Sequence, residues 1–96
     1  MTAYVIVDIS VTDPATYATY KQLAPAAVAA YGGHYVARGG RTVTLEGDWQ
    51  PERLVILQFE SVERAQAWWD SPEYRDAKAL RHQAARSRMV VIEGVA

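Results

Sequence analysis

The chain has 96 residues, 50% of them hydrophobic and 22% charged, which is the composition of an ordinary globular protein. A chain of this length builds one hydrophobic core, so we expect a single domain over residues 1–96. The absence of cysteine excludes disulfides and thiolate catalysis, and the net charge of −1 argues against nucleic-acid binding. No apolar run is long enough to span a membrane and no signal peptide is recognisable, so we expect a cytoplasmic protein without membrane contact.

The first two elements are predicted from their hydrophobic periods. Residues Ala3–Val11 alternate between a purely apolar face and a mixed face, as in a strand. Asp13-Pro14 is typical of a helix start, and apolar residues then recur at helical spacing as far as Gly32, the expected left-handed cap. Pro25 removes a backbone hydrogen bond from this helix, so we expect a kink or a broken pair of helices.

The middle of the chain is predicted to be extended. His34–Arg38 and Thr42–Glu46 are two short extended pieces separated by Gly39-Gly40. A hairpin turn or a bulge in one long strand would each explain the glycine pair, and we favour the bulge. A loop follows, and then the apolar, branched residues Leu54–Phe59 predict a buried strand.

The last third is predicted to hold two helices and a strand. Ser61 and Ser71 are expected N-caps, the second followed by proline, so two helices meet at an angle. One side of the second helix is predicted to carry Tyr74, Ala77, Arg81 and Ala84. Trp68 and Trp69 point about 100° apart on the first of them, and we expect Trp68 in the core and Trp69 partly exposed. Arg88–Val95 closes the chain as a strand.

This order predicts an α+β fold, the ferredoxin-like βαββαβ arrangement with an antiparallel sheet and both helices on one face. The other face of the sheet then has no helix to cover it. We expect that face to carry the apolar residues Tyr4, Ile6, Ile56, Met89 and Val91. A contiguous patch of this kind is unfavourable in water, so we expect a homodimer.

Four segments together resemble domain-of-unknown-function family 1330, in the dimeric α+β barrel superfamily. They are LAPAAVAAYGG (23–33), ARGG (37–40), EGDWQPERLVILQFES (46–61) and AWWDSPEYRDAKALR (67–81), and the resemblance covers nearly the whole chain. Related barrels include cofactor-free monooxygenases of polyketide biosynthesis, muconolactone isomerases and chlorite dismutase-like haem proteins. The resemblance therefore implies a fold and a dimer, and the fold alone does not choose among these activities.

Three residues are candidates for catalysis. Arg38, before two glycines, is suited to hold a carboxylate or enolate, although it could instead pair with Glu46 or Asp48 at the sheet edge. His34 and Asp8 are candidate proton carriers. Asp8 could instead form an ion pair with an arginine such as Arg38 or Arg88. We expect these three side chains to converge at the mouth of one cavity.

Three further residues are candidates for substrate binding: Tyr17, Trp68 and Arg81. For the aromatic pair the alternative is that they fill the core between helices and sheet. For Arg81 the alternative is a solvated basic patch shared with Arg86 and Arg88. Two histidines far apart in the sequence have no ligand-like spacing, so we expect no metal site, and no cofactor is indicated.

Two functional hypotheses from different classes remain. In the first, the dimer is a metal-free enzyme, oxygenase-like or isomerase-like, acting on a small anionic or aromatic organic molecule. In the second, it is a non-catalytic module that binds a small molecule or has a structural role. A cavity at which the candidate residues converge would favour the first, and a solidly packed interior would favour the second.

Overall fold

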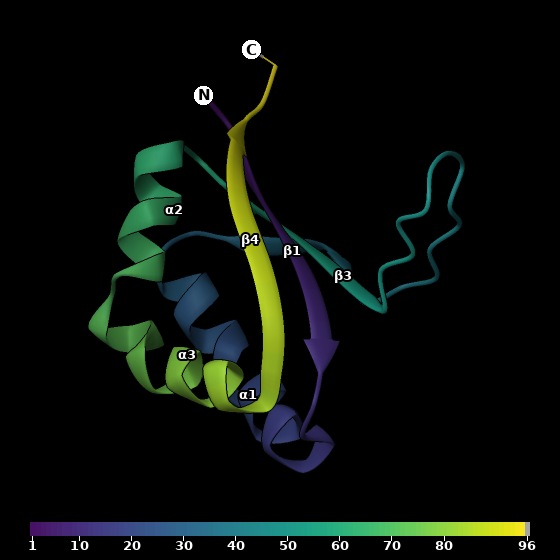
Figure 1. Cartoon of the computed structure of the whole chain (residues 1–96). Helices are drawn as coiled ribbons and strands as arrows, with labels where there is room; N and C mark the ends of the chain where they lie inside the picture. Colours follow the sequence, from purple (N-terminus) through teal and green to yellow (C-terminus); the bar gives the residue numbers. More distant parts are fainter. Residues whose placement is uncertain (96) are drawn as a thin grey trace.

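The computed structural model describes residues 1–95 as four strands and three helices. In chain order these are β1 (Ala3–Val11), α1 (Pro14–Ala30), β2 (His34–Arg38), β3 (Arg53–Phe59), α2 (Val62–Trp69), α3 (Pro72–Ala84) and β4 (Ala85–Glu93). The strands form one antiparallel sheet in the order β2-β3-β1-β4. The helices lie together on one side of this sheet (Figure 1). The predicted α+β, ferredoxin-like fold is confirmed.

The helix starts and ends follow the predicted signals. The side chains of Asp13, Ser61 and Ser71 each accept a hydrogen bond from the backbone N–H three residues later, at the starts of the three helices. Hydrogen bonds from Thr16 hold the pKa of Asp13 below its usual value. Gly32, with φ of +73°, ends α1 in the left-handed conformation that favours glycine.

Helix α1 is one helix rather than a broken pair, although Pro25 lies inside it. Proline at this position has no N–H to donate to the carbonyl of Lys21 four residues earlier. The Arg38 guanidinium reaches that carbonyl from β2, with its Nη2 2.9 Å from the oxygen. The helix therefore continues through the proline because a side chain from the sheet supplies the missing donor.

The core lies between the helices and one face of the sheet. Val5, Val7 and Ile9 of β1 are buried there, opposite Trp68 and Tyr74. Trp68 is 1% exposed and Trp69 is 40% exposed, which confirms the predicted division of the tryptophan pair. Along α3 the residues predicted to share one side, Tyr74, Ala77, Arg81 and Ala84, are all buried.

The outer face of the sheet, which no helix covers in the described residues, carries Tyr4, Ile6, Ile56, Val90 and Ile92. The prediction that Met89 and Val91 lie on this face was wrong. Their partners in β1 are Val7 and Val5, so they point to the core, and Val90 and Ile92 point outward, 62% and 56% exposed. Both sets are apolar, so the sequence could not indicate which set faces inward.

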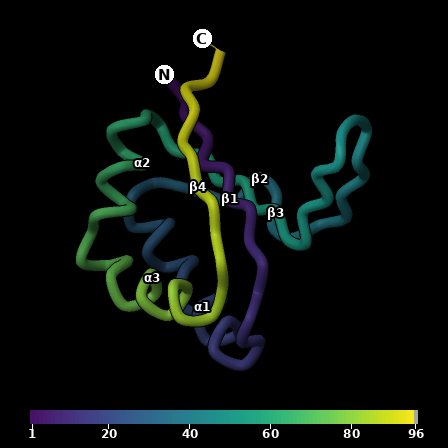
Figure 2. The backbone as a smooth tube through the Cα atoms, viewed as in Figure 1, coloured from purple at the N-terminus to yellow at the C-terminus, as the bar shows by residue number. Residues whose placement is uncertain are grey.

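Residues 39–52 form an arm that joins β2 to β3 without helix or strand. The predicted strand over Thr42–Glu46 was therefore wrong. The predicted bulge at the glycine pair was also wrong, because β2 ends at Arg38. A bulge lies instead at Val36, between Tyr35 and Ala37. The arm projects from the sheet on the side away from the helices (Figures 1 and 2). Its Leu45 is 94% exposed.

Candidate functional site

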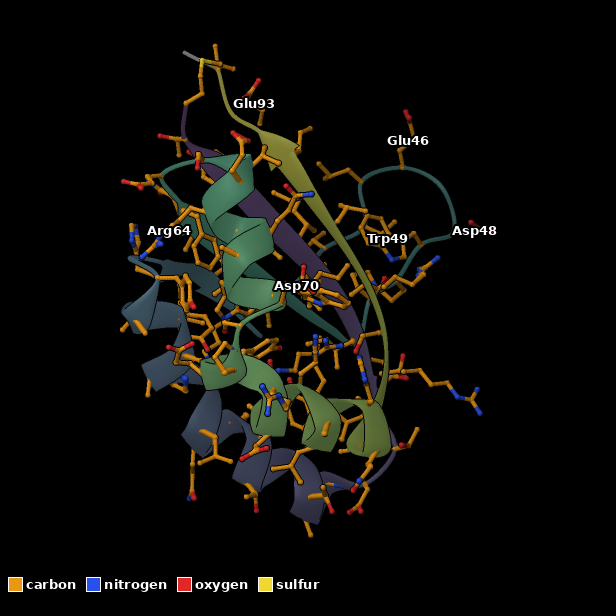
Figure 3. The ribbon with its side chains drawn as sticks, turned by 90° about the vertical axis from the view of Figure 1, so that its left-hand side faces the viewer. Glu46, Asp48, Trp49, Arg64, Asp70 and Glu93 are labelled. Carbon is orange, nitrogen blue, oxygen red and sulfur yellow. The ribbon has the colours of Figure 1, made fainter. Side chains whose placement is uncertain are left out.

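A cavity of about 460 Å³ lies between α2, α3 and β4 and is here called the α2–α3–β4 cavity. Figure 3 looks at this side, with Asp70 marking the end of α2 above α3 and β4 running alongside. The side chains that matter for its chemistry are Trp68, Trp69, Arg81, His82, Ser87 and Met89. They come from α2, α3 and β4, and Val5 of β1 also lies in the wall.

The corner between α2 and α3 fixes the inner wall of this cavity. The Ser71 hydroxyl donates to the carbonyl of Trp68 at 2.7 Å and accepts from the N–H of Tyr74 at 3.1 Å. These two bonds hold the turn, and the rings of Trp68 and Tyr74 stack with centroids 4.4 Å apart. Trp68 also packs on Phe59 of β3 at 5.2 Å. The indole is therefore a rigid wall rather than a mobile surface side chain.

Arg81 brings a buried positive charge to the cavity. It is 3% exposed, and its Nε donates to the Tyr74 hydroxyl at 3.2 Å. Within residues 1–95, the one recorded ion pair joins Arg88 to Asp8, so no carboxylate pairs with Arg81. The alternative that placed Arg81 in a solvated basic patch was wrong, because α3 turns this residue inward while Arg86 and Arg88 are exposed on β4.

Two more polar groups in the cavity wall have no partner. The Trp68 Nε1 and the Ser87 Oγ are both buried, and neither makes a hydrogen bond with the described residues. A buried polar group without a partner costs about 1–3 kcal/mol. Such groups are rare in folded proteins, and here two of them lie in the wall of one cavity beside the Arg81 guanidinium.

The mouth of the cavity is formed by more exposed side chains. The Lys78 ammonium lies 3.7 Å from the centroid of the Trp69 ring and donates to the Trp69 carbonyl at 2.8 Å, which holds this indole in place. His82 lies beside the cavity on α3. Its pKa is lowered by partial burial and then by the charges of Arg81 and Lys78, so His82 is neutral at pH 7 and can accept a proton.

On the other side of Trp68, under α1, lies a tyrosine cluster of Tyr17, Tyr20, Tyr35 and Tyr74. The cavity among these rings holds about 20 Å³, room for one water molecule. Arg53 donates to the Tyr17 hydroxyl at 3.0 Å, and the hydroxyls of Tyr20 and Tyr74 lie 2.9 Å apart. Burial raises the pKa of Tyr20, so its phenol stays protonated. This region is nearly filled, and the hydroxyls of Tyr17, Tyr20 and Tyr74 are hydrogen-bonded.

The three predicted catalytic residues do not converge on one cavity. His34 pairs with Gln58 of β3, which places it on the outer face, and Asp8 also lies on that face. Arg38 pairs with the core residue Val55 and therefore points to the helix side. In an unbroken strand His34 and Arg38 would share a face, but the extra residue at Val36 reverses the alternation between them.

Each of these three residues also has a local structural environment. Arg38 bonds the Lys21 carbonyl and lies over the Tyr35 ring, 4.3 Å from its centroid, rather than pairing with Glu46 or Asp48. Asp8 accepts from Arg88 at 2.7 Å, which confirms the ion-pair alternative, and from the Trp49 Nε1 at 3.0 Å. His34 is exposed at the start of β2.

The predicted substrate-binding residues divide between the two regions. Trp68 and Arg81 line the α2–α3–β4 cavity, and Tyr17 lines the small cavity of the tyrosine cluster. Sequence reasoning missed Ser87, because its position beside Trp68 depends on the pairing of β4. It also gave His82 no catalytic role. His82 follows Arg81 directly in α3, so the helical period places it at the edge of the side that Tyr74, Ala77, Arg81 and Ala84 share.

The sequence model of one protein family matches residues 2–95, nearly the full length of the chain. The chain belongs to the family described as Domain of unknown function (DUF1330). The family description states no activity, so any function for this DUF1330 chain has to be argued from its own geometry. No curated protein matches the chain by sequence.

Solved structures share the fold of this DUF1330 chain. A protein of unknown function from Rhodopseudomonas palustris has a TM-score of 0.78 and 21% identity over 99% of this chain and 83% of its own. SnoaB, a cofactor-independent oxygenase from Streptomyces nogalater, has a TM-score of 0.71 and 14% identity, covering 99% and 94%. A dimeric protein of unknown function with a ferredoxin-like fold, from Bacteroides fragilis, has 0.65 and 14%, covering 97% and 96%. At these identities the likeness shows the fold alone.

Two kinds of feature, a metal-binding group and a membrane-spanning helix, are absent from residues 1–95. Residues 1–95 contain no group of three or more histidine, cysteine, aspartate or glutamate side chains placed to hold a metal ion. Among the helices of the same residues, none has the length and apolar composition needed to cross a membrane.

Proposed function

We propose that this DUF1330 protein is a small-molecule enzyme whose substrate, a small aromatic molecule, lies in the α2–α3–β4 cavity. The observation that carries this proposal is the cavity itself. Its volume of about 460 Å³ falls within the usual range for ligand sites, and rigid Trp68 forms one wall. An aromatic ring that lies against the Trp69 indole, which is 40% exposed at the same cavity, gains dispersion and loses contact with water.

The class of reaction follows from the group that can move a proton. His82 is neutral at pH 7 because its pKa is lowered, and it lies at the cavity beside the positive charge of Arg81. A neutral imidazole can remove a proton from a phenol or from a carbon next to a carbonyl. Oxygenation without a cofactor and isomerisation both begin in this way. The shared fold with a cofactor-independent oxygenase supports this class as an analogy.

Anthrone tests this proposal, because its enolate reacts with O₂ to give anthraquinone and water. The protein should accelerate oxygen consumption, with one O₂ consumed and one anthraquinone formed per anthrone. His82→Gln should lower the rate by about 10²-fold, the usual size of a general-base effect. His34→Gln is the matched control and should leave the rate unchanged, because His34 lies on the outer face.

Three results separate the hypotheses. Turnover that depends on His82 supports the enzyme. Binding of anthrone with no turnover above the rate in buffer leaves the second hypothesis, a non-catalytic binding module. No binding of any aromatic compound at the cavity overturns the proposal as a whole. Native mass spectrometry of protein purified from its source would add the identity of any small molecule that stays bound.

The proposal includes a homodimer formed through the outer face. Tyr4, Ile6, Ile56, Val90 and Ile92 make this face apolar, and two similar folds are described as dimeric. A hollow of about 630 Å³ lies there between the arm and the sheet, lined by Ile6, Trp49 and Val90 among others. A second copy packed on this face would remove apolar surface at about 25 cal/mol per Å².

Sedimentation at micromolar concentration tests the dimer. The wild type should sediment as a dimer, and Ile56→Lys should dissociate or unfold it because the lysine would be buried without a partner. Gln83→Lys on exposed α3 is the control and should remain dimeric. A wild-type protein that is monomeric throughout would overturn the dimer and leave the cavity proposal standing.

A further inference from the structure

We infer that the inner end of the α2–α3–β4 cavity is a carboxylate-binding subsite centred on Arg81, so that the ligand is a small aromatic acid. This inference rests on the proposed function, because it takes the cavity as the ligand site and names the group that the ligand carries there. It uses three polar groups of the cavity wall: the Arg81 guanidinium, which has no carboxylate partner, and the Trp68 indole N–H and Ser87 hydroxyl, which make no hydrogen bond within residues 1–95.

The buried charge of Arg81 is unfavourable as long as no anion pairs with it. Arg81 is 3% exposed, and a buried guanidinium without an anion loses its hydration and gains no ion pair to compensate. Its Nε is held by the Tyr74 hydroxyl at 3.2 Å, and that hydroxyl is held in turn by Tyr20 at 2.9 Å. This chain of bonds uses one of the five N–H donors of the guanidinium. The remaining donors are those that an incoming carboxylate can use.

No internal anion competes for Arg81 within residues 1–95. Asp70 is the acidic residue that lines the cavity, but it is exposed at the end of α2 and forms no ion pair with Arg81 in residues 1–95. Arg53, by comparison, points its Nε at the Tyr17 hydroxyl from an intermediate position near solvent. Arg81 therefore combines deep burial, access to a large cavity and the lack of a carboxylate partner.

The donors of Arg81 also match a carboxylate ligand. A guanidinium presents parallel N–H donors that fit the two oxygens of a carboxylate, and such charge-assisted bonds are stronger than neutral ones. The Ser87 hydroxyl and the Trp68 indole N–H, both buried without a partner, lie beside Arg81 in the cavity wall. An aromatic acid would place its ring along Trp69, which is 40% exposed, and its carboxylate at Arg81.

The test compares 1-naphthoate with 1-naphthalenemethanol, which has the same ring system and no charge. Binding is followed by calorimetry and by the three indole N–H resonances of the wild type, which the single variants Trp49→Phe and Trp69→Phe assign. The wild type should bind naphthoate at least roughly tenfold more tightly than the alcohol, as expected for hydrogen bonds to a charged group. The Trp68 resonance should shift, and that of Trp49 on the outer face should not.

Variants assign the effect to Arg81. Arg81→Met should lower naphthoate affinity to that of the alcohol and leave alcohol binding unchanged. Its melting temperature should stay the same or rise, because an unpaired buried charge has been removed. Arg81→Lys keeps the charge but cannot bond both carboxylate oxygens in parallel, so its affinity for naphthoate should lie between those of the wild type and Arg81→Met. This variant keeps the test valid if Arg81→Met does not fold. Exposed Arg86→Met is the matched control and should bind like the wild type.

Three results would overturn the inference in different ways. Equal affinity of the wild type for the acid and the alcohol, with both shifting Trp68, removes the carboxylate subsite and leaves the cavity as a site for neutral aromatic molecules. No binding of either compound at millimolar concentration removes the subsite and the proposed function together. A shift of Trp49 in place of Trp68 also overturns it, because the ligand would then lie on the outer face.

Discussion

The two sides of Trp68 contain similar residues in opposite states. On the side of α1, the hydroxyls of Tyr17, Tyr20 and Tyr74 are hydrogen-bonded, and the cavity there holds only about 20 Å³. On the side of α2, α3 and β4, a cavity of about 460 Å³ has an arginine without a carboxylate and two buried groups without partners. Aromatic residues and arginines alone therefore do not mark a site. What distinguishes the second region is unsatisfied polarity next to open volume.

The comparison also indicates where stability and function lie. A region whose polar groups are paired internally contributes to stability and gains nothing from a ligand. A region with unpaired buried groups loses stability in the free protein and recovers it when a ligand supplies partners. Substitutions of polar groups on the two sides should therefore change the free energy of unfolding by different amounts and with opposite signs.

The largest effect is expected at the residue that separates the two regions. Trp68→Ala should lower the free energy of unfolding by about 3–5 kcal/mol, because a fully buried ring is lost from between Phe59 and Tyr74. Trp69→Ala removes a ring that is 40% exposed together with its contact to Lys78, and should cost no more than about 1 kcal/mol. Urea denaturation at one fixed protein concentration measures both. Equal losses would show that Trp68 is not the central wall.

The next prediction compares one hydroxyl from each region. Tyr74→Phe removes the acceptor of Arg81 and the partner of Tyr20, and should cost about 1–3 kcal/mol of unfolding free energy. Ser87→Ala removes a buried hydroxyl that has no partner, so the unfolding free energy of the ligand-free protein should change by less than about 0.5 kcal/mol or increase. A clear loss of stability in Ser87→Ala would mean that this hydroxyl is satisfied after all, and the contrast between the regions would fail.

The elements of this fold could be predicted because their signals are local. A serine or aspartate at each helix start, a glycine at the end of α1 and the inner side of α3 with Arg81 all follow from residues within two turns of each other. The placement of Trp68 in the core followed from the same helical geometry. The fold class then followed from the order of elements.

The candidate catalytic residues could not be placed because their positions depend on register. One extra residue at Val36 turns Arg38 to the face opposite His34. The alternation in β4 is apolar on both faces from Met89 onward, so its direction is set by pairing with β1 and not by its own sequence. The role of Arg38 at the carbonyl that Pro25 frees depends on a contact between α1 and β2, which lie 17 residues apart at this point.

That contact gives the third prediction. Arg38→Met should lower the free energy of unfolding by about 0.5–1.5 kcal/mol, because the Lys21 carbonyl loses its donor inside a helix that contains proline. Naphthoate affinity should be unchanged, because Arg38 does not line the α2–α3–β4 cavity. Arg41→Met on the exposed arm is the control and should change neither quantity. A loss of affinity with full stability would instead return Arg38 to the binding site.

The smallest effect is expected in the pH dependence of ligand binding. The pKa of His82 is lowered below 6.5 in the free protein by partial burial and by Arg81 and Lys78. A lowered pKa means that the unfolded chain binds the proton more readily, so the contribution of His82 to stability is complete above about pH 6.5 and is lost as the pH falls below it. A carboxylate bound beside His82 opposes the two positive charges and raises the pKa of the imidazole again.

Naphthoate binding should therefore take up a fraction of a proton, and its affinity should rise by about two- to fivefold between pH 7.5 and roughly pH 5.5, the size expected for an exposed charge pair. Asp70 also lines the cavity and is exposed at the end of α2. His82→Gln should abolish the rise and His34→Gln should keep it. Calorimetry in two buffers of different ionisation enthalpy measures the proton uptake directly. An affinity that falls on acidification, or a rise that survives in His82→Gln, would place the carboxylate away from His82 and so away from the inner end of the cavity.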